Sequence, residues 1–255
     1  MKICTTEIPD EVDQYENAIE SLALHVSKTE PDLLILAEMP FTPWIFYVDN
    51  FSEETWCNTV RNHDELLARL GEMIPTPLIT SRPITVDGLN LNQAIYLDRN
   101  RETHPLRAKR YLPNDFPAVE RVWFSEGEQS DPVFDIQGCK IGLQLCSEIM
   151  YTEIPRKLAM SDVQILVQPR ATGGHPRWRA ASVLAASTSG AFVVGANRRS
   201  SEKDWFAGSS WIYSPEGDLL AETTKTDPFV TIEIDLVESN NAKSEYPITM
   251  FRHYE

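Results

Sequence analysis

The sequence predicts one α/β domain, because stretches with helical periodicity alternate with short apolar stretches typical of buried strands. Its 11 glycines and 17 prolines are scattered, so no linker or internal repeat divides the chain. At 255 residues, the chain is long enough to bury a sizeable core within one such domain.

Four segments have the apolar spacing of a helix: residues 10–28, residues 52–71, a segment that begins near residue 152, and residues 179–189. Asp10 is the expected N-cap of the first helix. The second is expected to be interrupted near Asn62. The fourth is rich in alanine and ends at Gly190, a residue suited to a left-handed helix cap.

Short apolar runs between these helices predict the strands. The predicted strands are residues 33–37, 78–80, 91–97, 131–136, 139–145, 164–168, 192–196, 211–213, 219–220 and 229–236. The first is apolar throughout, as in a strand that is buried on both faces. Asp87-Gly88 marks a hairpin turn. Residues 229–236 alternate between apolar and polar, which indicates a half-exposed strand.

The charge balance argues against two classes of partner. Asp and Glu outnumber Lys and Arg by 38 to 23, a net charge of −15, whereas nucleic acids and anionic membranes bind positive faces. No stretch approaches the roughly 18 to 20 apolar residues of a membrane helix. The first residues lack the charged and apolar regions of a secretory signal. We therefore expect a cytoplasmic protein with no nucleic-acid or membrane partner.

The cysteines and histidines form no disulfide or metal-binding pattern. Cys4, Cys57, Cys139 and Cys146 are too few for a disulfide scaffold in a chain of this length. The sequence has no CxxC, HxH or HExxH spacing, so neither a zinc site nor another cofactor is expected. In a reducing compartment, each thiol is then either inert packing or a nucleophile.

Residues at the ends of apolar strands have the chemistry of a nucleophile and a base. Cys146 lies at a strand end, where α/β sheets place their sites, and a nearby cation would lower the pKa of its thiol. The alternative is a buried, inert cysteine. Glu38 closes the run 33–37, where a partly desolvated carboxylate suits a general base, although a lone glutamate can also cap a strand and point to water. Lys109 belongs to a basic cluster that, by itself, is typical of a solvated surface.

Together, Glu38, Lys109 and Cys146 resemble the Glu-Lys-Cys triad of the nitrilase, or carbon–nitrogen hydrolase, superfamily. The blocks that carry the resemblance are residues 32–39, 109–124, 141–148, 164–169, 178–186, 194–198 and 208–217. They extend the likeness over about residues 1–236, so it rests on several separated motifs rather than on one.

The resemblance implies a four-layer α-β-β-α sandwich and a mechanism based on cysteine. Cys146 is then the nucleophile, and Glu38 is the general base that later returns the proton. Lys109 and the backbone N–H of Ser147 are the implied donors to the oxyanion.

Two further carboxylates belong to the same blocks. Glu120 is implied to lie beside the triad and to position the lysine and the substrate nitrogen. The alternative is an ordinary surface ion pair with Arg121. Glu148, which lies two residues after the nucleophile, is interpreted as a structural residue that orients the turn.

Substrate contacts are predicted in a glycine-rich loop of the second half of the chain. There, Arg170 or Arg177 is suited to hold a substrate carboxylate bidentately, with His175 between them. Trp44 and Tyr47 are candidates for an apolar side of the pocket. The alternatives are a surface loop whose arginines offset the acidic chain, and aromatic residues that belong to the core.

The reaction implied is hydrolysis of the C–N bond of a small carboxamide through a thioester, with release of ammonia or an amine. Nitrile hydrolysis and N-carbamoyl amide hydrolysis stay open, because the same thiol attack serves them and residues 150–152 depart from the pattern of the amidase branch. A non-catalytic scaffold of the same fold is the alternative from another class. Such a scaffold has no physical need for all three triad residues.

The resemblance also implies self-association. Family members pair through sheets and helices, so a homodimer or a larger homo-oligomer is expected. Residues 1–236 are assigned to the hydrolase domain. Residues 237–255 form a C-terminal tail that is expected at the oligomer interface, with a loose C-terminus as the alternative.

Overall fold

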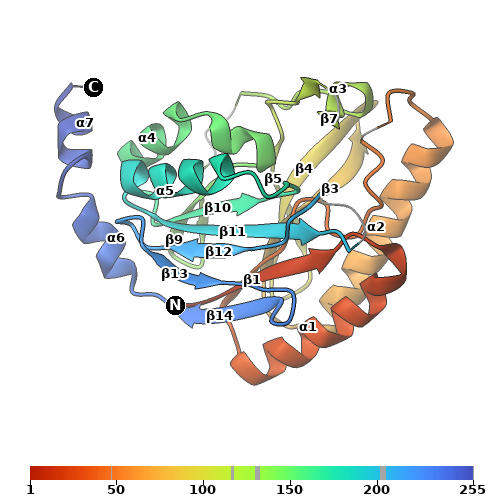
Figure 1. The fold of residues 1–255 in the computed structure, drawn as a ribbon, viewed down its shortest axis with the longest axis horizontal. Coiled ribbons are helices and arrows are strands. Elements are labelled where there is room, and N and C mark those ends of the chain that lie inside the picture. Colours follow the sequence, from red (N-terminus) through yellow and green to blue (C-terminus); the bar gives the residue numbers. More distant parts are fainter. Residues whose placement is uncertain (47, 116–117, 130–132, 202–204, 255) are drawn as a thin grey trace.

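The computed structural model describes residues 1–46, 48–115, 118–129, 133–201 and 205–254. Its main strands form two half-sheets (Figure 1). The first has the order β14 (Phe229–Glu233), β1 (Lys2–Pro9), β2 (Leu33–Ile35), β3 (Leu78–Val86), β4 (Leu89–Leu97), β5 (Thr103–Ala108). The second has the order β13 (Leu219–Glu222), β12 (Trp211–Tyr213), β11 (Phe192–Arg199), β10 (Ile165–Pro169), β9 (Cys139–Leu143), β8 (Val133–Ile136).

Strand β1 joins the two half-sheets at one end. Its residues 2–6 pair antiparallel with β14, and its residues 7–9 pair parallel with residues 197–199 of β11. Apolar side chains of both half-sheets, such as Ile35 and Val167, then pack against each other in one central core. The half-sheets therefore lie face to face, and the junction brings the carboxyl ends of β1 and β11 together.

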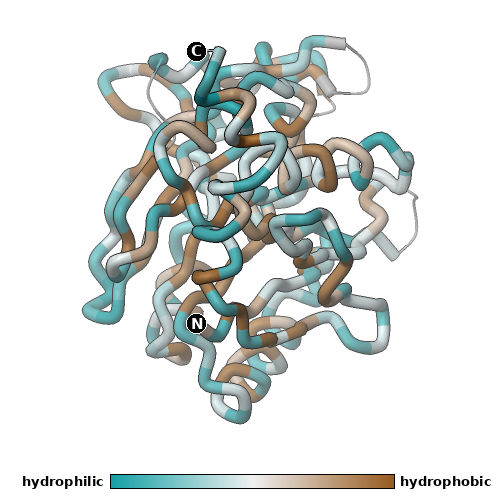
Figure 2. The backbone as a smooth tube through the Cα atoms, turned by 90° about the vertical axis from the view of Figure 1, so that its left-hand side faces the viewer, coloured by the Kyte–Doolittle hydropathy of each residue, from teal (hydrophilic) through white to brown (hydrophobic). Residues whose placement is uncertain are grey.

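Helices cover the outer face of each half-sheet. Helices α1 (Tyr15–Thr29) and α2 (Glu53–Met73) pack on the first half-sheet through a second apolar cluster. Helices α4 (Glu153–Met160) and α5 (Arg177–Ser189) pack on the second half-sheet through a third (Figure 1). Apolar segments gather in the interior and hydrophilic ones at the turns (Figure 2). These layers confirm the predicted α-β-β-α sandwich.

Most predicted elements are confirmed, and two details of the helices are wrong. Helix α2 runs without a break past Asn62, because the next side chain, His63, is fully buried and packs 5.9 Å from the ring of Phe41. Asp10 does not cap a helix. A short 3-10 turn, Val12–Gln14, precedes α1, and the Asp10 carboxylate accepts a hydrogen bond from Arg198 instead.

Strand β5 was not predicted, because Thr103–Ala108 lies at the edge of the sheet and has no apolar alternation. It nevertheless matters for the site, since Lys109 follows it directly. Edge strands bury only part of their side chains, so their sequences carry a weak periodic signal.

The C-terminal tail forms two helices that pack on this same chain. In α6 (Leu236–Ala242), the Ser239 hydroxyl donates to the carbonyl of Gly190 over 2.6 Å. In α7 (Ile248–Tyr254), the ring of Phe251 lies 5.2 Å from the guanidinium of Arg156 in α4. The described tail is therefore docked rather than loose, and its role in an oligomer stays a prediction. No helix among the described residues combines the length and apolarity needed to cross a bilayer.

Candidate active site

The three triad residues come from three strand ends and lie together in the interior. Glu38 follows β2, Lys109 follows β5, and Cys146 follows β9. Lys109 Nζ donates to Glu38 Oε1 over 2.9 Å, although 71 residues separate them in the sequence. The side chains of Glu38 and Lys109 are fully buried, and Cys146 is 6% exposed. The Glu38 N–H donates to the carbonyl of Arg170 over 3.3 Å, and the Cys146 thiol donates to the carbonyl of the next residue, Ala171, over 3.7 Å, so all three residues belong to one site.

Glu120, at the start of the short helix α3 (Glu120–Trp123), completes the surroundings of the lysine. Both of its carboxylate oxygens accept from Lys109 Nζ, over 2.9 and 2.8 Å. Lys109 Nζ therefore contacts three oxygens that belong to two carboxylates. Glu120 is buried, and Arg121 pairs with Glu126 over 3.0 Å, so the alternative of a surface pair between Glu120 and Arg121 is wrong.

Asn92, on β4, is a site residue that the sequence analysis missed. Its Nδ2 donates to Glu38 Oε1 over 2.8 Å, and its backbone carbonyl accepts from the backbone N–H of Lys109 over 2.8 Å. The other oxygen of Glu38, Oε2, is buried and has no hydrogen-bond partner among the described residues. One signal was available, since Asn92 occupies an inward position of an alternating strand, where a polar side chain needs a partner.

Cys146 has an unusual backbone conformation. Its φ is +46°, in the left-handed region that a non-glycine residue rarely adopts, and it opens a 3-10 helix, Cys146–Met150. Its thiol donates to the carbonyl of Ala171 over 3.7 Å. Such strained backbone persists where the surroundings hold it, and it is concentrated at functional sites.

The charges of the site are unbalanced, with two carboxylates for one ammonium. Burial raises the pKa of the Cys146 thiol well above its ordinary value, and the charge of Glu38 adds to this more than Lys109 offsets it. Lys109 thus lowers this pKa, as expected of a nearby cation, but burial and Glu38 raise it by more. Burial opposes the charge of Lys109, but Glu120 and Glu38 together raise the pKa of its ammonium well above the usual range. Burial raises the pKa of Glu120 to about 7.

The buried carboxylate of Glu148 joins the turn Cys146–Met150, here called the nucleophile turn after the predicted role of Cys146, to residues 107–110. Glu148 is buried and accepts hydrogen bonds from the guanidinium of Arg107 and from the N–H groups of Arg110 (2.9 Å) and Leu145 (2.8 Å). Arg107 and Arg110 flank Lys109, whereas Leu145 directly precedes Cys146. Glu148 therefore holds the two segments in register, which supports its interpretation as a structural residue.

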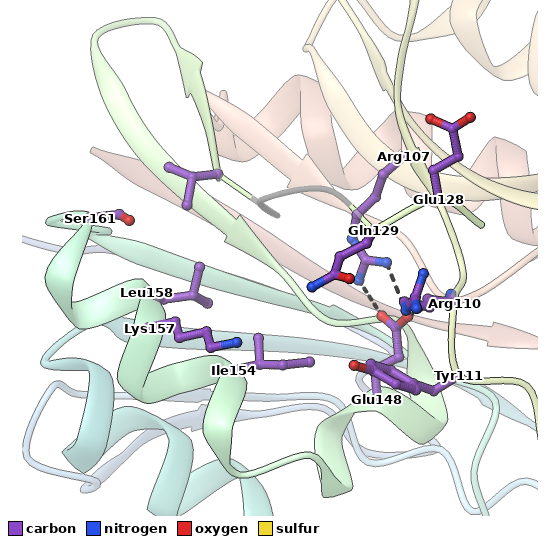
Figure 3. A pocket seen from close by; sticks show the side chains of 11 residues that line it. Arg107, Arg110, Tyr111, Glu128, Gln129, Glu148, Ile154, Lys157, Leu158 and Ser161 are labelled. Carbon is purple, nitrogen blue, oxygen red and sulfur yellow. Dashed lines mark hydrogen bonds and ion pairs between the residues drawn. The ribbon is translucent and has the colours of Figure 1, made fainter. Parts of the chain in front are cut away.

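Figure 3 shows the Glu148 carboxylate at the edge of a cavity of about 100 Å³. Arg107 and Glu148 point toward each other on one side of it. Ile154, Lys157 and Leu158 of α4 line the opposite side. The described lining of this cavity includes Glu148 but none of the triad residues.

Ser147 is held by its side chain. Its hydroxyl donates to the carbonyl of Tyr111 over 2.7 Å, which fixes the residue after Cys146 to the chain that follows Lys109. The backbone N–H of Ser147 belongs to the first turn of a helix, where N–H groups lack partners inside the helix.

The predicted substrate-binding residues are divided between three places. Arg170 and His175 line a pocket of about 310 Å³. Arg177 is exposed at the start of α5. Trp44 packs with the aromatic rings of Phe46 and Phe206, at 5.0 and 5.2 Å between centroids, in an apolar cluster near the site. Tyr47 lies outside the described residues.

The described residues offer one group with ligands for a metal ion, and it includes none of the triad residues. Asp98, Glu102 and His104 bring their ligand atoms within 4.8 Å of one another at the surface. His104 Nε2 already bonds to Asp98 Oδ2 over 3.0 Å, and Asp98 also accepts from nearby backbone N–H groups. These bonds account for the arrangement. Inside the site, the ammonium of Lys109 takes the central position among the carboxylates.

Comparisons with known proteins identify the family of the chain. The sequence profile described as carbon-nitrogen hydrolase matches residues 3–243. An omega-amidase, NIT2-A of Xenopus laevis, is 28% identical over 144 residues, which are 52% of each chain. The N-carbamoylputrescine amidase of Arabidopsis thaliana is 22% identical over 71% of this chain and 66% of its own length. A citrullinase of Francisella tularensis is 24% identical over 58% of this chain and 57% of its own. The chain thus spans about half the length of the omega-amidases it matches.

Solved structures show the same fold. A carbon-nitrogen hydrolase from Helicobacter pylori G27 superposes with a TM-score of 0.83 at 19% identity, over 98% of this chain and 94% of that one. An amidase from Nesterenkonia sp. superposes with a TM-score of 0.77 at 19% identity, over 100% and 96%. At such identities, the superposition is evidence for the fold alone.

Proposed function

The chain belongs to the carbon–nitrogen hydrolase family, and from this premise we propose that it hydrolyses the C–N bond of a small carboxamide and releases ammonia or an amine. The observation that carries the proposal is the contact of Lys109 Nζ with Glu38 and Glu120, within electrostatic reach of Cys146. A buried thiol, a buried base and a buried cation in one place supply the groups that acyl transfer needs.

In the first half of the reaction, Glu38 takes the proton of Cys146 as the sulfur attacks the carbonyl carbon. The new C–S bond leaves a negative charge on the oxygen, which Lys109 and the backbone N–H of Ser147 stabilise. The C–N bond then breaks, and the proton passes from Glu38 to the departing nitrogen. The products of this half are an amine, or ammonia, and a thioester on Cys146.

In the second half, water replaces the amine. Glu38 takes a proton from the water, and the oxygen attacks the thioester carbon. The oxyanion forms again beside the same donors and collapses as the C–S bond breaks. The sulfur recovers the proton from Glu38, and the carboxylic acid leaves.

The electrostatics of the free protein support this use of Glu38. Burial raises the pKa of the Cys146 thiol well above its ordinary value, so attack by the sulfur requires a base within the site. Glu120 is then a positioning residue, because its bidentate contact holds the ammonium of Lys109 at the place where the oxyanion develops.

A second candidate is hydrolysis of an N-carbamoyl compound. Its support is the similarity to an N-carbamoylputrescine amidase and to a citrullinase, whose names describe substrates other than simple carboxamides. The attack on carbon is the same. The thiol can also attack the carbon of a nitrile, but none of the relatives reported above is named as a nitrilase.

A panel of small carboxamides, N-carbamoyl amines and nitriles, assayed for release of ammonia, tests these candidates. We expect turnover of carboxamides and, in intact-protein mass spectra, an acyl adduct that is lost in Cys146→Ala. Turnover of N-carbamoyl compounds alone would favour the second candidate. Inactivity toward the whole panel, together with a Cys146 that does not react with iodoacetamide, would favour a non-catalytic scaffold.

We further propose that the protein acts in the cytoplasm as a homodimer or larger homo-oligomer. All four cysteines are free, as suits a reducing compartment. Light scattering of the purified chain measures the mass of the assembly, and a monomer at micromolar concentration would contradict the proposal.

A further inference from the structure

Arg170 is a buried cation at the end of β10. Its side chain is 1% exposed, and the guanidinium stacks on Trp211, 3.5 Å from the ring centroid. It donates to Thr172 Oγ1 over 3.1 Å and to the carbonyl of Ser209 over 2.9 Å. These contacts fix the orientation of the side chain.

The charge of Arg170 is not matched by a carboxylate. A guanidinium has five N–H donors, and the described residues accept two hydrogen bonds from it, none of them through a carboxylate. Its Nε is buried and has no partner in the described part of the chain. Burial lowers the pKa of Arg170 to about 9, because the opposing charge of Cys146 offsets only part of the burial effect and the positive charge of Arg179 adds to it. A buried cation in this condition is costly unless something else compensates it.

The pocket that Arg170 lines has the composition of an anion site. It measures about 310 Å³, and its described lining includes Arg170, Arg179 and His175 but neither Asp nor Glu. Arg179 is paired with Glu222, which lies outside the lining. A positive pocket is unexpected on a chain with a net charge of −15. Its volume suits a small molecule.

We propose that this pocket binds a small carboxylate anion through the guanidinium groups of Arg170 and Arg179. Planar guanidinium and planar carboxylate match in bidentate geometry, which makes arginine the residue of choice for this recognition. The carboxylate has two possible sources: an arm of the amide substrate, in which case the proposal rests on the proposed function, or a separate acid.

The pocket is coupled to the triad through three consecutive residues. The carbonyl of Arg170 accepts from the Glu38 N–H over 3.3 Å, and the carbonyl of Ala171 accepts from the Cys146 thiol over 3.7 Å. Thr172, the next residue, accepts from the Arg170 guanidinium. An anion that moves this guanidinium therefore acts on the segment that contacts both the base and the nucleophile.

Calorimetric titration of succinate into the Cys146→Ala protein tests the site without turnover. We expect saturable binding with one succinate per chain, weakened at least tenfold by Arg170→Gln. Neutral succinamide, which has no carboxylate, should show no saturable binding. Arg61→Gln, which removes an exposed arginine on α2, is the matched control and should leave binding unchanged. If Arg170→Gln fails to fold, Arg179→Gln provides the second test, with the same direction expected.

Inhibition kinetics of the active protein separate the two sources. Competitive inhibition by succinate identifies the pocket as the place of a substrate carboxylate, and noncompetitive inhibition identifies a separate acid. Either pattern supports the site. Absence of saturable binding to folded Cys146→Ala protein, or equal binding by Arg170→Gln, overturns it. Because binding is measured without catalysis, failure of the proposed amide hydrolysis would leave this result intact.

Discussion

Two buried charged clusters meet at residues 170–171, and their charges are unbalanced in opposite directions. In the triad cluster, Glu38 and Glu120 surround the single ammonium of Lys109. In the arginine cluster, Arg170 and Arg179 stack on Trp211, and Glu222 pairs with Arg179 alone. The first cluster has one negative charge in excess and the second has one positive charge in excess.

The two clusters therefore differ in their proposed use of charge. In the triad cluster a negative charge moves from one group to another during the reaction, whereas the arginine cluster binds an anion from outside. When Glu38 takes the thiol proton, its negative charge disappears as the oxyanion appears beside Lys109. The proposed reaction therefore relocates a charge and creates none. The charge of Cys146 acts on Arg170 from within the chain, and in our proposal an external carboxylate neutralises the positive charge that is left.

The largest expected effect comes from removing the nucleophile. Cys146→Ala should lower kcat by at least about 10⁴, since loss of a nucleophile in other hydrolases costs as much or more. Ammonia release with a substrate of the wild-type protein measures it. Cys139→Ala is the control, because Cys139 is also buried but packs in the central core. Comparable loss in both variants would mean that the triad cluster is not the reactive one.

The next-largest effect is expected in the free energy of unfolding, where Lys109→Met and Arg170→Met compare the two clusters directly. Lys109→Met leaves two buried carboxylates without their cation, so we expect a loss of about 3–5 kcal/mol in the free energy of unfolding. Arg170→Met removes a cation that has no carboxylate partner, so we expect a change within about 1 kcal/mol. Urea denaturation measures both. Equal destabilisation by the two variants would show that Arg170 is compensated in the folded protein.

The pH dependence of kcat/KM tests whether the triad cluster needs the negative charge of Glu120. Glu120 has a pKa raised to about 7, so it is protonated below that pH and no longer holds Lys109 as an anion. We expect kcat/KM to fall as the pH decreases through about 7. Glu120→Gln should lower kcat/KM by about 10²-fold and shift this acid limb. An acid limb at the same pH in Glu120→Gln would assign it to another group.

The smallest effect is expected at Glu148, which acts only through the backbone. Burial opposes its charge, but Arg107 and two backbone N–H groups hold the pKa of Glu148 below its usual range. Glu148→Gln keeps the shape and weakens these bonds, so we expect about a tenfold loss of kcat. The rate of Cys146 alkylation against pH should shift as well. If both the alkylation profile and kcat stay unchanged, Glu148 does not position Cys146.

The sequence by itself determined most of the elements and the positions of the three triad residues. Helices and buried strands carry their burial as a local periodicity, so Arg177–Ser189 and Phe192–Arg199 could be predicted from a few neighbouring residues. Glu38 and Cys146 could be singled out because polar groups at the ends of apolar strands are conspicuous, and the family likeness added Lys109.

Only the tertiary structure decided which polar groups meet. Lys109 and Glu38 are 71 residues apart, Asn92 and Glu38 are 54 apart, and Arg107 and Glu148 are 41 apart. No local pattern encodes such pairs, because hydrogen bonding and ion pairing depend on the register of strands that are distant in the sequence. The same holds for Arg170. That it is an arginine could be read from the sequence, but its stacking on Trp211 and its lack of a carboxylate follow from which side chains the fold places around it.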